Sequence, residues 1–115
     1  MNRRTYALGR LKTGQMNKTE AAYDSHLAAL QAAGLILWRK FEGLKLRLAD
    51  NTFYTPDFAV MTAGGGIELH EVKGFWTDDA RVKIKVAAEL YPFRFLAVKA
   101  RPKGRGGGWE VEHFG

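Results

Sequence analysis

The sequence predicts an α/β domain in which a mixed central sheet is flanked by helices. Three observations indicate this class: a capping signal followed by helical periodicity near the start, alternating apolar residues through the middle, and a second helical segment that leads into a short apolar strand. The expected order of elements is αβββαβ, with a further strand after a glycine-rich loop. At 115 residues, the chain 1–115 is long enough for one domain with a single core.

The first helix is expected to begin after Asn17. The segment "NKTE" at 17–20 is a capping box, with Asn17 as N-cap and Glu20 at the third helical position. Gly34 supplies the C-terminal stop. An apolar stripe at helical spacing lies between these ends and consists of Tyr23, Leu27 and Leu30.

The strands are expected in the middle of the chain. The segment 35–43 reads as extended, and 44–50 alternates, with its leucines on one face. After a turn at "DN", residues 52–61 read as the next strand. "TAGGG" closes a hairpin, and 67–75 reads as its second strand. The three central strands, at 44–50, 52–61 and 67–75, are expected to form an antiparallel meander.

A second helix is expected over 78–90. Thr77 is its predicted N-cap, and the two acids that follow suit the positive end of the helix dipole. The apolar stripe of this helix consists of Val82, Val86 and Leu90. Pro92 ends the helix, which crosses over to a strand at 93–100 that can lie parallel to one of the earlier strands. A last edge strand is expected at 109–114.

The composition excludes several classes of protein. There are no cysteines, so disulfides and thiolate zinc sites are excluded, and a reducing cytoplasm is expected. No apolar run approaches the roughly 18 residues of a membrane span, so no membrane association is expected. The N-terminus has positive charges but no hydrophobic segment after them, and it does not read as a signal peptide.

The formal charge of +6 is concentrated in two segments that contain no acid, a basic N-terminal arm at 1–15 and a basic glycine-rich loop at 100–108 with the lysine before it. Their basic residues are Arg3, Arg4, Arg10 and Lys12 in the first, and Lys99, Arg101, Lys103 and Arg105 in the second. One interpretation is solvated ends that keep the protein dissolved. The other is two flexible arms that neutralise phosphates of DNA.

Three ionisable residues are expected to converge on the hairpin. Side chains alternate along a strand, so Glu71 and Lys73 share one face, and hairpin pairing can bring Asp57 beside them. Two converging carboxylates repel unless one is protonated or a cation bridges them. Hard oxygen ligands without cysteine favour Mg²⁺ or Mn²⁺, and the backbone carbonyl of Val72 can add another oxygen.

Such a site suits phosphodiester hydrolysis. A divalent ion polarises a nonbridging phosphate oxygen and activates water. Lys73, held beside it, can orient that water and stabilise the charge that develops on the phosphate.

These residues resemble the signature of the PD-(D/E)XK nuclease superfamily. "PD" at 56–57 is followed, after a hairpin-length gap, by "EVK" at 71–73. That superfamily has a restriction-endonuclease-like αβββαβ core, the order predicted above. The pattern "FTPDF…ELHEVKGF-T-D…K…YP-F-F" is similar to that of small phage- and prophage-encoded nucleases, although this chain reads "FYTPDF" at 53–58 in place of "FTPDF". The resemblance spans about residues 17–99, and the two basic segments lie outside it. It implies the cytoplasm of a bacterium or of a phage-infected host.

The resemblance implies a role for each of four residues. Asp57 and Glu71 ligate metal, and Lys73 is catalytic. Glu20 matches an acidic residue that many members place near the start of the first helix to complete the metal site. Its capping role explains Glu20 equally well, so both interpretations stay open.

Further candidates have two interpretations each. Lys83 and Lys85 on the second helix form a solvated face or contact the DNA backbone. Trp76 packs in the protein or stacks on a nucleobase. His70 falls on the strand face opposite Glu71, where a packed or surface histidine is expected rather than a base.

The function expected from the sequence is that of a Mg²⁺-dependent DNA endonuclease. Without a separate reading domain, recognition of DNA structure is expected rather than of a long sequence, with branched, Holliday-junction-like DNA as the substrate by analogy. Symmetrical cutting of two strands requires a homodimer. The alternatives are a noncatalytic nucleic-acid-binding module on the same fold and an RNA-cleaving nuclease.

Overall fold

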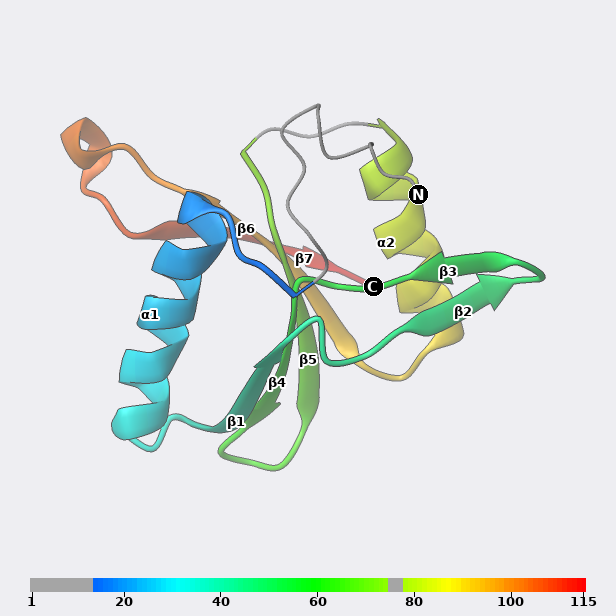
Figure 1. Ribbon diagram of the computed structural model, residues 1–115, viewed down its shortest axis with the longest axis horizontal. Helices are drawn as coiled ribbons and strands as arrows, with labels where there is room; N and C mark the ends of the chain where they lie inside the picture. The colour runs from blue at the N-terminus through cyan, green and yellow to red at the C-terminus, as the bar shows by residue number, and fades with distance from the viewer. Residues whose placement is uncertain (1–13, 75–77) are drawn as a thin grey trace.

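The computed structural model describes residues 14–74 and 78–115, and within them a mixed five-stranded sheet lies between two helices (Figure 1). The strand order in the sheet is β1-β4-β5-β6-β7. These strands are β1 (Ile36–Phe41), β4 (Phe58–Thr62), β5 (Ile67–Val72), β6 (Arg94–Ala100) and β7 (Trp109–Phe114). The predicted α/β class is therefore confirmed.

The main sheet follows the predicted scheme only in part. β1, β4 and β5 form an antiparallel meander, so its first strand is 36–41; the expectation that 44–50 begins the meander is wrong, because β2 (Leu46–Ala49) lies in a separate sheet. As expected, β6 lies parallel to β5 after the crossover through α2 (Asp78–Leu90). β7 pairs antiparallel with β6 at the edge of the sheet, as expected for the last strand.

The first helix, α1 (Lys18–Ala32), begins at its predicted cap. The Asn17 side chain accepts a hydrogen bond from the Glu20 N–H at 2.8 Å, and the Glu20 carboxylate accepts one from the Asn17 N–H at 2.9 Å. Gly34 follows the helix with φ of +80°, a conformation that glycine adopts without steric penalty.

A second, two-stranded sheet is formed by β2 (Leu46–Ala49) and β3 (Thr52–Tyr54). The prediction of one continuous strand over 52–61 is therefore wrong. The chain leaves the ladder between Tyr54 and Phe58, where Pro56 has no N–H to donate. Asn51, with φ of +53°, lies in the turn of this hairpin.

The helix α2 confirms the predicted range but not the expected use of its apolar residues. Ile84 and Ala87 are its buried residues. The stripe of Val82, Val86 and Leu90 is exposed. The periodicity correctly indicated a helix but did not decide which face is buried. Ile84, Ala87 and Ala88 form a second stripe with helical spacing, and this stripe faces the sheet.

The two faces of the sheet carry separate hydrophobic clusters. The cluster under α1 contains Tyr23, Leu27, Ile36, Phe58, Val60, Val72 and Val98. The cluster under α2 and the β2–β3 hairpin contains Leu46, Tyr54, Ala59, Leu69, Ile84, Ala87 and Phe95. The alternation of side chains along β5 thus places Val72 toward α1 and Leu69 toward α2.

Several predicted residues lie outside the described ranges. They are Arg3, Arg4, Arg10 and Lys12 of the N-terminal arm, together with Trp76 and Thr77. No helix in 14–74 or 78–115 is long and apolar enough to cross a membrane.

Candidate active site

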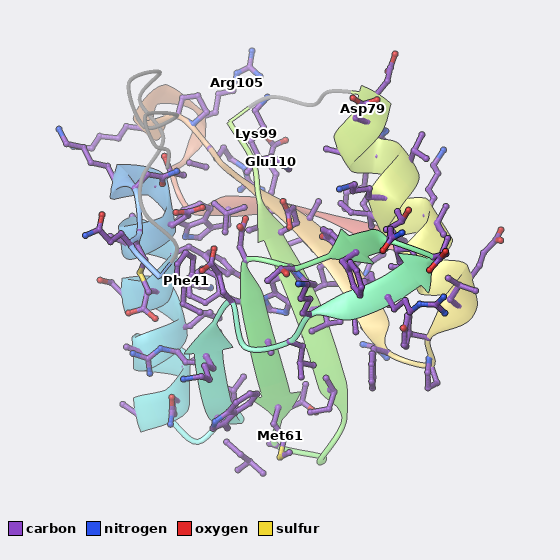
Figure 2. The ribbon with its side chains drawn as sticks, turned by 45° about the vertical axis from the view of Figure 1, so that its right-hand side comes forward. Phe41, Met61, Asp79, Lys99, Arg105 and Glu110 are labelled. Carbon is purple, nitrogen blue, oxygen red and sulfur yellow. The ribbon has the colours of Figure 1, made fainter. Side chains whose placement is uncertain are left out.

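The candidate site lies where the parallel strands β5 and β6 end. The ladder from Glu68–Arg94 to Val72–Val98 sets both strands in the same direction, so their carboxyl ends share one edge. The Lys73 N–H extends the pairing by donating to the Val98 carbonyl at 2.9 Å. In Figure 2, Lys99 marks this edge, while Met61 lies at the opposite end, beside the β4–β5 turn.

Asp57 is positioned by backbone contacts from two neighbouring segments. The Glu42 N–H, just after β1, donates to the Asp57 carbonyl at 2.7 Å. The Val72 N–H donates to Asp57 Oδ2 at 2.8 Å. Val72 lies beyond the last paired residues of β4 and β5, so a side-chain carboxylate takes the place of a ladder acceptor.

Glu71 and Lys73 point to the same side of β5 and contact each other. Lys73 Nζ lies 3.0 Å from Glu71 Oε2. Glu71 is only 8% exposed, so its carboxylate is held away from bulk water with a cation beside it. The predicted sharing of one strand face by these two residues is confirmed.

The electrostatics of Asp57 show that the two carboxylates interact. Burial and the Glu71 charge raise the pKa of Asp57 from 3.8 to about 8, and the charge of Glu20 acts in the same direction. The Val72 N–H and the Lys73 ammonium offset part of this shift. At neutral pH the pair therefore favours one shared proton or a bound cation.

Tyr54 is a site residue that the sequence reasoning missed. Its hydroxyl donates to Glu71 Oε1 at 2.8 Å from the end of β3. Burial and the Glu71 carboxylate raise the pKa of the Tyr54 hydroxyl, which keeps it a donor. Its position two residues before the "PD" pair was the available signal, but reading 52–61 as one strand hid its separate placement.

Glu20 lies near the site and is already engaged. Its Oε1 accepts the capping hydrogen bond from Asn17, which confirms the structural interpretation of this residue. Its charge still contributes to the raised pKa of Asp57. The role of Glu20 as a metal ligand stays a prediction.

The donor set fits a hard divalent cation with few protein ligands. Among the described residues, no three His, Cys, Asp or Glu side chains are arranged to hold a metal between them. Mg²⁺ commonly takes only one or two carboxylates and keeps several waters. Asp57 and Glu71 provide that number, and the oxygens that contact Val72, Tyr54 and Lys73 each keep a second lone pair. The Val72 carbonyl stays a predicted further ligand.

Two of the predicted basic residues are close to the site. Lys83 of α2 lines an open pocket of about 340 Å³ together with Glu71, Lys73 and the β3 end. Lys99 lines a second pocket of about 240 Å³ that also contains Lys73 and two acids of β7, Glu110 and Glu112.

The other described basic candidates line neither pocket with Lys73. Lys85 is exposed on α2. Arg101, Lys103 and Arg105 are exposed on the loop between β6 and β7, which includes the 3-10 turn η2 (Lys103–Arg105). Figure 2 shows Arg105 beyond the same sheet edge as Lys99. Their contact with DNA stays a prediction.

His70 belongs to the opposite face of the sheet, as expected. It is buried, with Nδ1 2.7 Å from the Tyr23 hydroxyl and Nε2 2.9 Å from Glu68 Oε1. This places His70 in the packing between α1 and the sheet, away from Glu71.

Comparison with models of known protein families, with curated proteins and with solved structures finds no match to this chain.

Proposed function

We propose that this protein is a metal-dependent DNA endonuclease that hydrolyses phosphodiester bonds at the Asp57–Glu71–Lys73 site. The observation that carries the proposal is the convergence of these three side chains at one sheet edge, with the pKa of Asp57 raised to about 8 by burial and by Glu71. A buried carboxylate pair of this kind is destabilising by itself and gains from a cation.

The chemistry assigns a separate task to each side chain. Asp57 and Glu71 would hold Mg²⁺ or Mn²⁺, which when bound supplies Lewis-acid polarisation of the phosphate. Tyr54 and the Val72 N–H fix the orientation of the two carboxylates. Lys73 places an ammonium beside them, where it stabilises negative charge on the phosphate and orients the attacking water. Attack of water on phosphorus breaks a P–O ester bond and leaves one phosphate monoester and one hydroxyl end.

The element order supports a restriction-endonuclease-like core for this proposal. When the β2–β3 hairpin is treated as an insertion, the remaining elements run αβββαβ with β7 added. The described residues contain no separate reading domain, so we infer selection by DNA structure, with branched DNA as the substrate. One chain contributes one such site, and paired cuts on two strands would use a homodimer.

A cleavage assay on supercoiled, linear, single-stranded and four-way-junction DNA tests the proposal, with Mg²⁺, Mn²⁺ or EDTA. Wild type should cut with either metal and not in EDTA. Asp57→Ala should lose cleavage, while Lys73→Ala should lose most turnover but retain metal binding.

The matched control is Lys40→Ala, which removes an exposed lysine from β1. It should cut like wild type. Cleavage by Asp57→Ala at the wild-type rate would reject the site, and binding of DNA without cleavage by any preparation would favour the noncatalytic alternative.

A further inference from the structure

An exposed aromatic ring stands on the rim of the candidate site. Phe53 of β3 is 42% exposed and lines the same 340 Å³ pocket as Glu71 and Lys73. Its neighbour Tyr54 points the other way, into the core, where it bonds Glu71. Alternation along β3 therefore links one residue that holds the site with one that faces solvent beside it.

Two lysines contact Phe53, one at the ring and one at the backbone. Lys45 Nζ lies 4.6 Å from the centroid of the Phe53 ring, and Lys83 Nζ lies 3.4 Å from the Phe53 carbonyl oxygen. Lys45 directly precedes β2, and Arg47 pairs with Phe53 across the hairpin. The Arg47 side chain is exposed and lies 3.8 Å from Asp50 Oδ1. Within the pocket itself the cations are Lys73 and Lys83, and they lie beside the acids Glu71 and Asp79.

The hairpin is fixed against α2, so the ring has a defined position. The leucines of the hairpin pack against the buried face of α2. The Tyr91 hydroxyl, just after α2, donates to the Arg47 carbonyl at 2.6 Å. Figure 1 shows β2 and β3 lying alongside α2. Preorganised aromatic rings bind with little loss of conformational entropy.

We propose that Phe53 stacks on an unpaired base of a DNA strand whose neighbouring phosphate enters the Glu71–Lys73 pocket. An aromatic face flanked by lysines is the usual arrangement for binding single-stranded nucleic acid. Stacking on a base is stronger than an exposed cation–π contact, and Lys45, once displaced from the ring, stays within reach of the adjoining phosphate. A base inside a duplex is already stacked on both sides, so the site takes strands with an unpaired base. This inference rests on the proposed function and names the form of its substrate.

The test measures binding in EDTA, where no metal-dependent cleavage occurs. Fluorescence anisotropy is recorded for a single-stranded oligonucleotide, a forked duplex and a blunt duplex of equal length. Phe53→Ala should raise the Kd for the first two about tenfold and change the blunt-duplex Kd by less than about twofold. Phe53→Trp should restore tight binding, whereas Phe53→Leu, which keeps apolar volume on the hairpin, should bind like Phe53→Ala.

The matched control is Trp38→Ala, because Trp38 is an exposed aromatic residue, 37% accessible, on β1 outside this pocket. It should bind all three probes like wild type. A 2-aminopurine at the fork should be quenched by wild type and by Trp38→Ala, but not by Phe53→Ala. Unchanged binding by Phe53→Ala, or an equal loss on the blunt duplex, would overturn the proposal.

The two proposals fail in different ways. If stacking is observed but no metal supports cleavage, the endonuclease proposal fails and the base-stacking surface stands. If cleavage is observed but Phe53→Ala binds single strands normally, only the stacking inference fails.

Discussion

Backbone N–H groups hold Asp57 at its main chain and at its carboxyl group, while its surroundings disfavour the charge of that carboxyl. The Glu42 and Val72 N–H groups fix its main chain and its Oδ2, while burial and Glu71 disfavour its charge. The hydrogen bond from Val72 therefore favours the charged carboxylate, whereas burial and Glu71 favour its protonated form. This conflict is typical of functional sites, and it gives Asp57 a measurable influence on stability.

Replacing Asp57 by asparagine should flatten the pH dependence of stability of the metal-free protein. The folded-state pKa, about 8, lies above the ordinary 3.8, so the protonated carboxyl stabilises the fold fully below about pH 4. That contribution is lost as pH rises from about 4 to 8. Asparagine keeps an acceptor for the Val72 N–H without a charge. Thermal melts in EDTA from pH 5 to 8 should therefore show that the melting temperature of Asp57→Asn rises relative to that of wild type as pH increases. A constant difference in melting temperature across this range would contradict the prediction.

Removing the Tyr54 hydroxyl should destabilise the protein because Glu71 loses a buried donor. A hydrogen bond to a charged group contributes about 1.5–3 kcal/mol, so Tyr54→Phe should lower the melting temperature by at least about 5 °C. Tyr91→Phe is the matched control, since it removes a more exposed bond from the same hairpin. Its effect should be smaller, and equal effects would argue against a special role for the Tyr54–Glu71 hydrogen bond.

Among the elements, both helices and most strands could be predicted from local pattern. The capping box predicted the start of α1, and 78–90 matched α2 residue for residue. The buried face of α2 could not be predicted, because two apolar stripes share its helical period and packing against the main sheet and the hairpin selects Ile84 and Ala87.

The break between β3 and β4 was missed for a related reason. The run 52–61 is largely apolar, and Pro56 allows either an edge strand or an interruption. The predicted positions of Asp57, Glu71 and Lys73 were not affected by this error, because all three depend on the β4–β5 hairpin, whose pairing was predicted correctly. The position of Tyr54 was affected, because it depends on a separate sheet.

The loop between β6 and β7 should contribute to DNA affinity without sequence preference. Replacing Lys99, Arg101, Lys103 and Arg105 by alanine should weaken duplex binding and reduce the log–log salt slope by about 0.9 for each phosphate that the loop no longer neutralises. Titrations at several salt concentrations measure this. Arg94→Ala, at the opposite end of β6, is the control and should leave the slope unchanged. A slope that the quadruple substitution does not alter would place the loop away from the DNA backbone.

At the scale of the whole molecule, Mg²⁺ should stabilise the fold more at pH 8 than at pH 6. A ligand at about 100 times its Kd adds about 2.7 kcal/mol to the free energy of unfolding. Below the pKa of Asp57, binding must first remove a proton, which lowers affinity by up to about tenfold per pH unit. Melts with Mg²⁺ and with EDTA at both pH values measure the difference. In Asp57→Asn, the stabilisation by Mg²⁺ should no longer depend on pH. In wild type, an Mg²⁺-induced rise in melting temperature of equal size at both pH values would contradict the proposed role of Asp57 as a metal ligand.

The site draws on two sheets that are hydrogen-bonded separately. Glu71 and Lys73 belong to β5 and its end, with β4 on one side and β6 on the other, whereas Phe53 and Tyr54 belong to the β2–β3 sheet. Each sheet can therefore open with its own free energy. In hydrogen exchange, amides of the β2–β3 ladder should lose protection well before those of β5, by sub-global opening. In the main state, Tyr54 covers Glu71. In a second, sparsely populated state, the hairpin has opened and Glu71 and Lys73 are exposed to solvent while the main sheet stays folded.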